Sequence, residues 1–280
     1  MISLRHFFTI ILLPTYVFTN VNAETLPSQL NLERGWDSAD GSDYFVDADI
    51  DLSGPRLFIG YGESDSQLGS TVLNTTTTQV ELSSNPFNDT AMAIGYSEWG
   101  QDGEIDIKTY RLDFIFNTDN WGFRLAPQTR EIELYTLAAM RPKINLDSDG
   151  INVGINYYAA EPFYIGAVYS AHNYSRNLST LSTDPRLALI FSPATMEYAF
   201  GFEKERIAGN MGLAFSWGSA GIDGSRSVSE IDNSISTSIA VSIRYKLNKH
   251  WSIKARGGQS DNSFSTAKIS FGSVSVGYQF

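Results

Sequence analysis

The last eight residues of the chain read Ser273-Val274-Ser275-Val276-Gly277-Tyr278-Gln279-Phe280. They alternate small or polar residues with apolar ones, and the sequence stops on a phenylalanine. Successive side chains of a β-strand point to opposite faces, so the four apolar residues share one face and the four small or polar residues share the other. This pattern is typical of a strand with lipid on one side and water on the other.

A last strand that ends in an aromatic residue resembles that of Gram-negative outer-membrane β-barrel proteins, porins among them. The resemblance implies an environment of outer-membrane lipids and lipopolysaccharide. It also implies insertion by the outer-membrane insertion machinery, which in the family recognises the last strand, here ending in Phe280. A soluble β-sandwich can also end on an amphipathic strand, so the rest of the chain must decide.

The start of the chain has the features of an export signal. Arg5 precedes the apolar stretch FFTIILLPTYVF, and Val21-Asn22-Ala23 offers small residues before a cleavage point. We therefore predict a signal peptide over residues 1–23, cleaved after Ala23, and one barrel domain over 24–280. No later stretch approaches the roughly 18 to 20 apolar residues of a membrane-spanning helix. Any crossing of a membrane must then be made by strands.

Charge and composition exclude several classes of protein. Without Arg5, 19 of the 20 Lys and Arg remain against 31 Asp and Glu, a formal charge of −12. Nucleic-acid partners usually require a basic surface, so none is predicted. The absence of cysteine excludes disulfides, Cys-ligated metals and a lipoprotein anchor. We predict no cofactor and no metal site.

Alternation bounded by turn residues predicts an all-β fold. The expected architecture is a transmembrane, antiparallel, up-and-down β-barrel of about 14 strands. Two strands, 29–35 and 77–83, are weak, and loss of one hairpin would leave about 12. The predicted strands are 29–35, 44–52, 56–63, 77–83, 90–98, 105–117, 121–131, 151–159, 163–172, 195–203, 211–218, 236–247, 251–258 and 269–280.

The connections alternate between short turns and longer polar loops. Outer-membrane barrels have short periplasmic turns and long outer loops, which places both termini in the periplasm. The predicted turns are 53–55, 85–88, 117–120, 160–162, 205–210 and 248–250, and the predicted loops include 64–76, 132–150, 173–194 and 219–235. Within 173–194, the apolar run Leu187–Phe191 either folds inward as a constriction or extends a strand.

Tryptophans provide a further test of the barrel, because indole rings prefer the membrane–water interface. Trp121 and Trp251 directly follow short turns, so we place them in the lower aromatic girdle. Trp36, Trp99 and Trp217 fall at the opposite ends of their strands and are assigned to the upper girdle.

The charged positions of the strands predict the inner wall. A cation that faces lipid near the bilayer centre costs about 2–4 kcal/mol, so the charged face of each strand must point into the lumen. The residues assigned to the lumen are Asp47, Asp49, Asp51, Arg56, Arg111, Asp113, Arg124, Arg244, Lys246, Lys254 and Arg256.

The acidic group near the start of the chain and the basic group near its end would set up a field across the bore. This distribution favours a porin-like channel for passive diffusion of small hydrophilic solutes, and no enzymatic activity is predicted. The alternative is that these charges pair with one another and form a closed polar plug.

The sequence also carries signals of three other functions. Residues 145–150 have the alternating oxygens of a calcium loop, but Asn156 stands where a bidentate Glu is needed, and a hairpin turn explains the residues equally well. His172, with Ser170 and Ser175 nearby, suggests a lipid-modifying barrel enzyme. A structural or adhesive outer-membrane barrel is the third alternative, although the loops carry no repeated motif that argues for it.

Overall fold

The computed structural model describes residues 27–68, 71–87, 89–103, 105–135, 143–158, 163–176, 202–230, 233–263 and 268–280. Within these ranges, no helix is long and apolar enough to cross a membrane. The strands are β1 (Gln29–Asp37), β2 (Ser42–Asp51), β3 (Arg56–Leu68), β4 (Thr71–Phe87), β5 (Thr90–Gln101), β6 (Ile105–Asn117), β7 (Trp121–Tyr135), β8 (Lys143–Tyr158), β9 (Phe163–Tyr174), β10 (Glu203–Phe215), β11 (Gly218–Ser229), β12 (Ile235–Lys246), β13 (Trp251–Asn262) and β14 (Ile269–Gln279).

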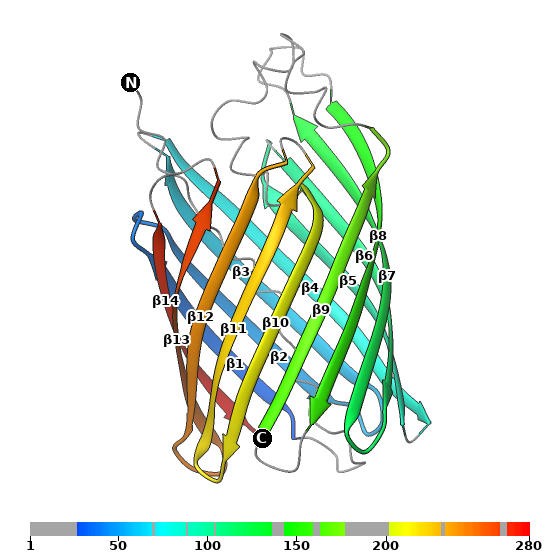
Figure 1. The fold of residues 1–280 in the computed structure, drawn as a ribbon, viewed down its shortest axis with the longest axis vertical. Helices are drawn as coiled ribbons and strands as arrows, with labels where there is room; N and C mark the ends of the chain where they lie inside the picture. Colours follow the sequence, from blue (N-terminus) through cyan, green and yellow to red (C-terminus); the bar gives the residue numbers. More distant parts are fainter. Residues whose placement is uncertain are drawn as a thin grey trace.

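The strands form a closed antiparallel barrel in which each strand pairs with its neighbours along the chain (Figure 1). The first and last strands complete the ring, from Gln29 opposite Gln279 to Asp37 opposite Phe271. The prediction of an up-and-down barrel of 14 strands is confirmed, and the alternative of 12 strands is wrong. Both weak strands are present, as β1 and as part of β4.

The outer face of the barrel is apolar. On β12, Ile239, Val241 and Ile243 are 56%, 59% and 49% exposed, whereas Ala240 between them is 2% exposed. On the last strand, Val274, Val276 and Tyr278 share the outer face, as predicted. A closed ring leaves no unpaired strand edge, which is the condition for strands to cross hydrocarbon.

The hairpin between β9 and β12 differs from the prediction. β10 and β11 meet at a turn around Ser216, so the predicted turn 205–210 lies inside β10 and most of the predicted loop 219–235 is β11. The predicted strand 195–203 lies outside the described residues up to position 201. The sequence of β11, GSAGIDGSRSVS, is rich in Gly and Ser and carries little alternation, which is why its pattern predicts a loop.

Two predicted outer loops are largely strand. β3 continues to Leu68 and β4 begins at Thr71, while β7 continues to Tyr135 and β8 begins at Lys143. β4 and β8 have 17 and 16 residues, against 9 in β1. The green strands of the barrel therefore rise above the blue and red strands at the end away from the C-terminus (Figure 1). The predicted constriction by residues 187–191 lies outside the described residues.

Above the lipid-facing belt, the polarity of the wall reverses. On the outer face of β7, Phe123 and Leu125 are followed by Glu131, whereas the inner Ile132 and Leu134 are each 1% exposed. The inner face here belongs to an apolar core that consists of Ile105, Ile107, Ile132, Leu134, Leu146, Tyr174 and Phe202, with Trp99 and Ile144 packed against it. The reversal indicates that this part of the wall has water rather than lipid outside it.

The tryptophans only partly follow the prediction. Trp121 and Trp251 begin β7 and β13 at the end that carries the C-terminus, as predicted, and Trp36 lies at the opposite end of β1. Trp217 was placed at the wrong end, because the turn between β10 and β11 was missed. Trp99 was also misplaced, since it packs inward against the apolar core.

Candidate functional site on the inner wall of the barrel

All eleven residues assigned to the lumen lie on the face opposite the lipid-facing side chains. Asp47, for example, lies between Asn31 and Gly60 in the strand register, whereas the adjacent Val46 is 37% exposed on the outer face. By strand, the residues are Asp47, Asp49 and Asp51 on β2, Arg56 on β3, Arg111 and Asp113 on β6, Arg124 on β7, Arg244 and Lys246 on β12, and Lys254 and Arg256 on β13. Their role in conduction stays a prediction.

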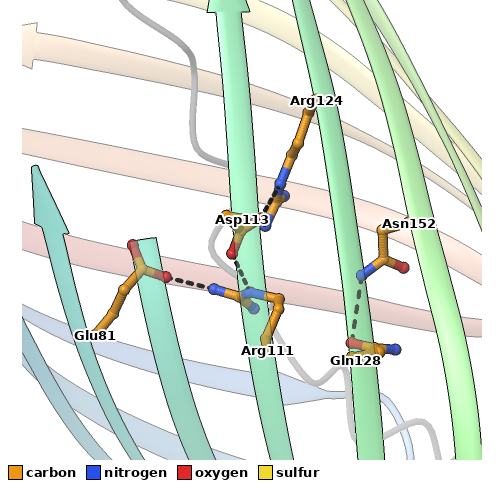
Figure 2. Close-up of polar contacts among 6 residues, drawn as sticks. All are labelled: Glu81, Arg111, Asp113, Arg124, Gln128 and Asn152. Carbon is orange, nitrogen blue, oxygen red and sulfur yellow. Dashed lines mark hydrogen bonds and ion pairs between the residues drawn. The ribbon is translucent and has the colours of Figure 1, made fainter. Parts of the chain in front are cut away.

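A ladder of ion pairs follows the inner face of β4 to β7 (Figure 2). Arg111 Nε donates to Asp113 Oδ2 at 2.5 Å, and its Nη2 donates to Glu81 Oε2. Arg124 Nε donates to the other carboxylate oxygen of Asp113, also at 2.5 Å. Glu81 and Arg111 reach each other across Gly95 of β5, where a Cβ would lie 3.5 Å from Arg111 Nη2. A small residue on the strand between them therefore permits a pair two strands apart.

The same construction recurs on the other side of the barrel. Arg256 Nη2 on β13 lies 2.5 Å from Asp223 Oδ2 on β11, and the strand between them, β12, places the small residues Ala240 opposite Asp223 and Ser242 opposite Arg256. The Arg256 guanidinium also lies 5.2 Å from the centre of the Phe271 ring, a cation–π contact. Together with a pair between Arg56 and Asp49, these contacts engage six of the eleven predicted residues.

Three predicted cations have no carboxylate partner within 4.0 Å among the described residues: Arg244, Lys246 and Lys254. Arg244 and Lys246 are exposed although they face inward, and Lys254 is half-buried. Two predicted acids also lack a described cation partner. Asp47 accepts a hydrogen bond from Asn31 Nδ2 at 2.7 Å, and Asp51 accepts one from the backbone N of Ser53 at 2.9 Å.

The acidic group on β2 and the basic group on β12 and β13 lie on neighbouring parts of the inner wall rather than on opposite sides of the bore. In the closed ring, only β1 and β14 separate β2 from β13. The predicted field across the bore is therefore wrong in its direction, because the prediction did not take account of how few strands the closure puts between the two groups. A field between these two groups would run along the inner wall, over the seam between β1 and β14.

Several charged residues of the inner wall were missed by the sequence reasoning, among them Glu81, Glu33 and Asp223. Glu81 shares the inner face of β4 with Gln79 and Ser83. Glu33 on β1 follows the lipid-facing Leu32. The alternation of inward and outward side chains therefore predicts the inner face for both carboxylates. Asp223 was missed because the sequence pattern of β11 predicts a loop.

His172 does not form a serine–histidine pair in the described part of the chain. Its side chain is 8% exposed on the inner face of β9, and Nε2 lies 3.0 Å from Nε2 of Gln128. Its Nδ1 faces Gly150 of the intervening strand, where a Cβ would be 2.4 Å away. Ser175 Oγ instead accepts a hydrogen bond from the backbone N of Asp147. The ring is thus held along the wall, between Gln128 of β7 and Tyr174 of its own strand.

The calcium interpretation of residues 145–150 is wrong, and so is the hairpin turn. All six residues lie inside β8, where Asp147 and Asp149 face outward and Ser148 faces inward. A continuous strand cannot wrap its oxygens around one ion. Across the described residues, no group of three or more His, Cys, Asp and Glu side chains could hold a metal ion.

Comparisons by sequence find no match, since no protein-family model fits the chain and no curated protein resembles it. Solved structures do match its fold. The CymD monoaromatic hydrocarbon channel has a TM-score of 0.60 and 8% identity, covering 92% of this chain and 90% of its own. The outer membrane protein Omp33 of Acinetobacter baumannii has a TM-score of 0.51 and 8% identity, covering 91% of this chain and 98% of its own.

A third neighbour is the outer-membrane expressed OmpT of Vibrio cholerae, with a TM-score of 0.50 and 11% identity over 91% of this chain and 97% of its own. Identities this low show a shared fold, while function depends on the residues placed on it. The comparisons resolve no subfamily. The closed ring of 14 antiparallel strands therefore shares the fold of these outer-membrane β-barrel proteins.

Proposed function

We propose that the barrel is a water-filled channel for passive diffusion of small hydrophilic solutes. The observation that carries the proposal is the exposure of Arg244 and Lys246 on the inner wall. An ionised side chain without a partner needs water around it, so the wall near these residues must be hydrated. A ring of 14 strands is also wider than the 8-stranded barrels whose interior is filled by side chains.

The setting of this channel is part of the proposal. We place the barrel in the outer membrane of a Gram-negative cell, surrounded by outer-membrane lipids and lipopolysaccharide, after removal of a signal peptide at Ala23. An enzymatic role is not proposed, because the described contacts of His172 do not include a nucleophile. A structural or adhesive role gains no support from the fold neighbours, one of which is described as a channel.

Bilayer recordings of the refolded protein test this function. We expect stable conductance in KCl, and an increased preference for K⁺ over Cl⁻ when Arg244, Lys246 and Lys254 are all changed to Gln, because the unpaired cations attract anions. The matched control is Arg256→Gln with Asp223→Asn, which removes an ion pair and leaves the net charge unchanged. A barrel that does not conduct would refute the channel, and unchanged reversal potentials would refute the role of the three cations.

A further inference from the structure

One register row of the inner wall joins a cationic group to an acidic group across the closing seam. Lys254 on β13 lies opposite Ser275 on β14, and Ser275 lies opposite Glu33 on β1. Arg244 on β12 continues the same row beside Lys254. Adjacent strands are about 4.8 Å apart, so the Cα atoms of Lys254 and Glu33 are about 10 Å apart with one small residue between them.

This row has the same layout as the ion pair between Arg111 and Glu81, but it is open. In both rows a cation and a carboxylate lie two strands apart with a small residue, Gly95 or Ser275, on the strand between. Arg111 and Glu81 bond directly. Lys254 and Glu33 form no ion pair within 4.0 Å with each other or with any other described residue, although each is within electrostatic range of the other.

The nearest charged neighbours of Lys254 and of Glu33 on their own sides of the seam carry the same sign, so they do not compensate either charge. On the basic side, Arg244 and Lys254 are directly opposite each other, and like charges in that position repel. On the acidic side, Asp47 lies on the strand next to Glu33, one step along the wall. The basic side therefore favours a negative group, and the acidic side favours a positive one.

Access to this row is available from the bore. Lys254, Ser275 and Glu33 are all half-buried, and their side chains lie on the face opposite the lipid. Ser275 is short and provides a hydroxyl between the two charged groups, so it can donate a hydrogen bond to a solute without blocking either charge.

We propose that this row, Arg244–Lys254–Ser275–Glu33, is a binding site for zwitterionic solutes that carry a carboxylate and an ammonium group, such as amino acids and short peptides. The carboxylate contacts Lys254 and Arg244, and the ammonium contacts Glu33. An extended dipeptide spans about 7 Å, which fits between side chains that arise from positions about 10 Å apart. The site rests on the proposed channel function and narrows it to a class of solute.

The test measures how glycylglycine affects the barrel in planar bilayers. Glycylglycine has no net charge, so a saturable fall in KCl conductance on its addition reports binding in the bore. We expect the half-saturating concentration of glycylglycine to rise at least tenfold in Lys254→Gln and in Glu33→Gln. It should stay unchanged in Lys249→Gln, which makes the same charge change as Lys254→Gln but in the turn outside the barrel. The conservative variant Lys254→Arg keeps the positive charge beside Arg244 and should retain binding.

The outcomes separate the site from the channel. Equal half-saturating concentrations in the wild type and both single variants would overturn the site while leaving the channel intact. Equal effects of N-acetylglycine, glycinamide and glycylglycine would also overturn it, because they would indicate two independent ion sites. If the wild type does not conduct KCl, the channel is refuted. Calorimetric titration of the refolded barrel with glycylglycine then tests whether the site binds its ligand, and absence of binding refutes the site.

Discussion

At the level of single residues, Asp113 shows how the inner wall combines burial with charge. Its side chain is 2% exposed and accepts hydrogen bonds from Arg111 and Arg124. Removing one member of a buried ionic network leaves the others uncompensated, at a cost of about 3–5 kcal/mol. Because both arginines keep some contact with water, we expect Asp113→Asn to lower the free energy of unfolding by about 3 kcal/mol, measured by denaturant unfolding of the refolded barrel.

Asp51→Asn is the matched control for that measurement. The change is chemically the same, but within the described residues the Asp51 carboxylate accepts only a backbone hydrogen bond, at the exposed turn after β2. Exposed substitutions of this kind usually change stability by about 0.5 kcal/mol or less. Equal losses of stability in the two variants would show that the ladder from Glu81 to Arg124 contributes no more than an exposed turn.

Residue-level reasoning from the sequence predicts which side chains face inward but not which of them pair. The cost of a charge in lipid fixes the face of each strand, and this placed Arg111 and Arg124 correctly on the inner side. The partner of Arg111 is 30 residues away, on a strand two positions along the ring. That contact depends on two strand registers and on the size of Gly95, which alternation alone does not reveal.

At the level of strands, alternation with an apolar outer face predicts the strands where the wall faces lipid, but not where the polarity of the wall is reversed. β7 was predicted to end at residue 131 and β8 to begin at 151, whereas the strands run to Tyr135 and from Lys143. Between these limits the apolar residues, such as Ile132 and Leu146, face inward and the carboxylates face outward. A rule that requires an apolar outer face reads such a segment as a polar loop, although its period of two is unbroken.

Glycines on the inner strands allow large side chains to lie flat against the wall. Gly212 of β10 lies opposite Tyr164 of β9, and a Cβ there would be 2.4 Å from the Tyr164 hydroxyl. Gly212→Val should therefore lift the phenol ring into the bore. We expect lower single-channel conductance in bilayers and a loss of stability of about 1–3 kcal/mol from overpacking.

Two further variants separate the blocking of the bore from general damage. Gly209→Val adds the same side chain to the same strand on the lipid face, where the only neighbour within 4 Å in the described part of the chain is the Gly166 carbonyl oxygen, at 3.6 Å. It should leave conductance unchanged. Tyr164→Ala combined with Gly212→Val should restore conductance, because no ring remains to be displaced. Persistent loss of conductance in the double variant would contradict this role of Gly212.

For the whole molecule, closure of the ring depends on backbone pairing between the two ends of the chain. Nine register pairs join β1 to β14, and Phe280 N donates to Ser28 O at 2.9 Å beyond them. The side chain of Phe280 is 60% exposed, and its ring stacks on Tyr278 with centres 6.1 Å apart. The terminal residue therefore contributes little to the packing of the folded barrel.

Deletion of Phe280 can thus distinguish recognition by the insertion machinery from stability of the fold. The variant loses one backbone hydrogen bond, worth about 1 kcal/mol, so it should refold in detergent almost as well as the wild type. In cells, we expect its level in the outer membrane to fall sharply, because the resemblance to outer-membrane barrels implies that the terminal aromatic is recognised during insertion. Phe280→Trp keeps an aromatic end and should insert normally. Quantified outer-membrane fractions together with refolding yields check this, and a normal membrane level of the deletion variant would contradict the proposed recognition.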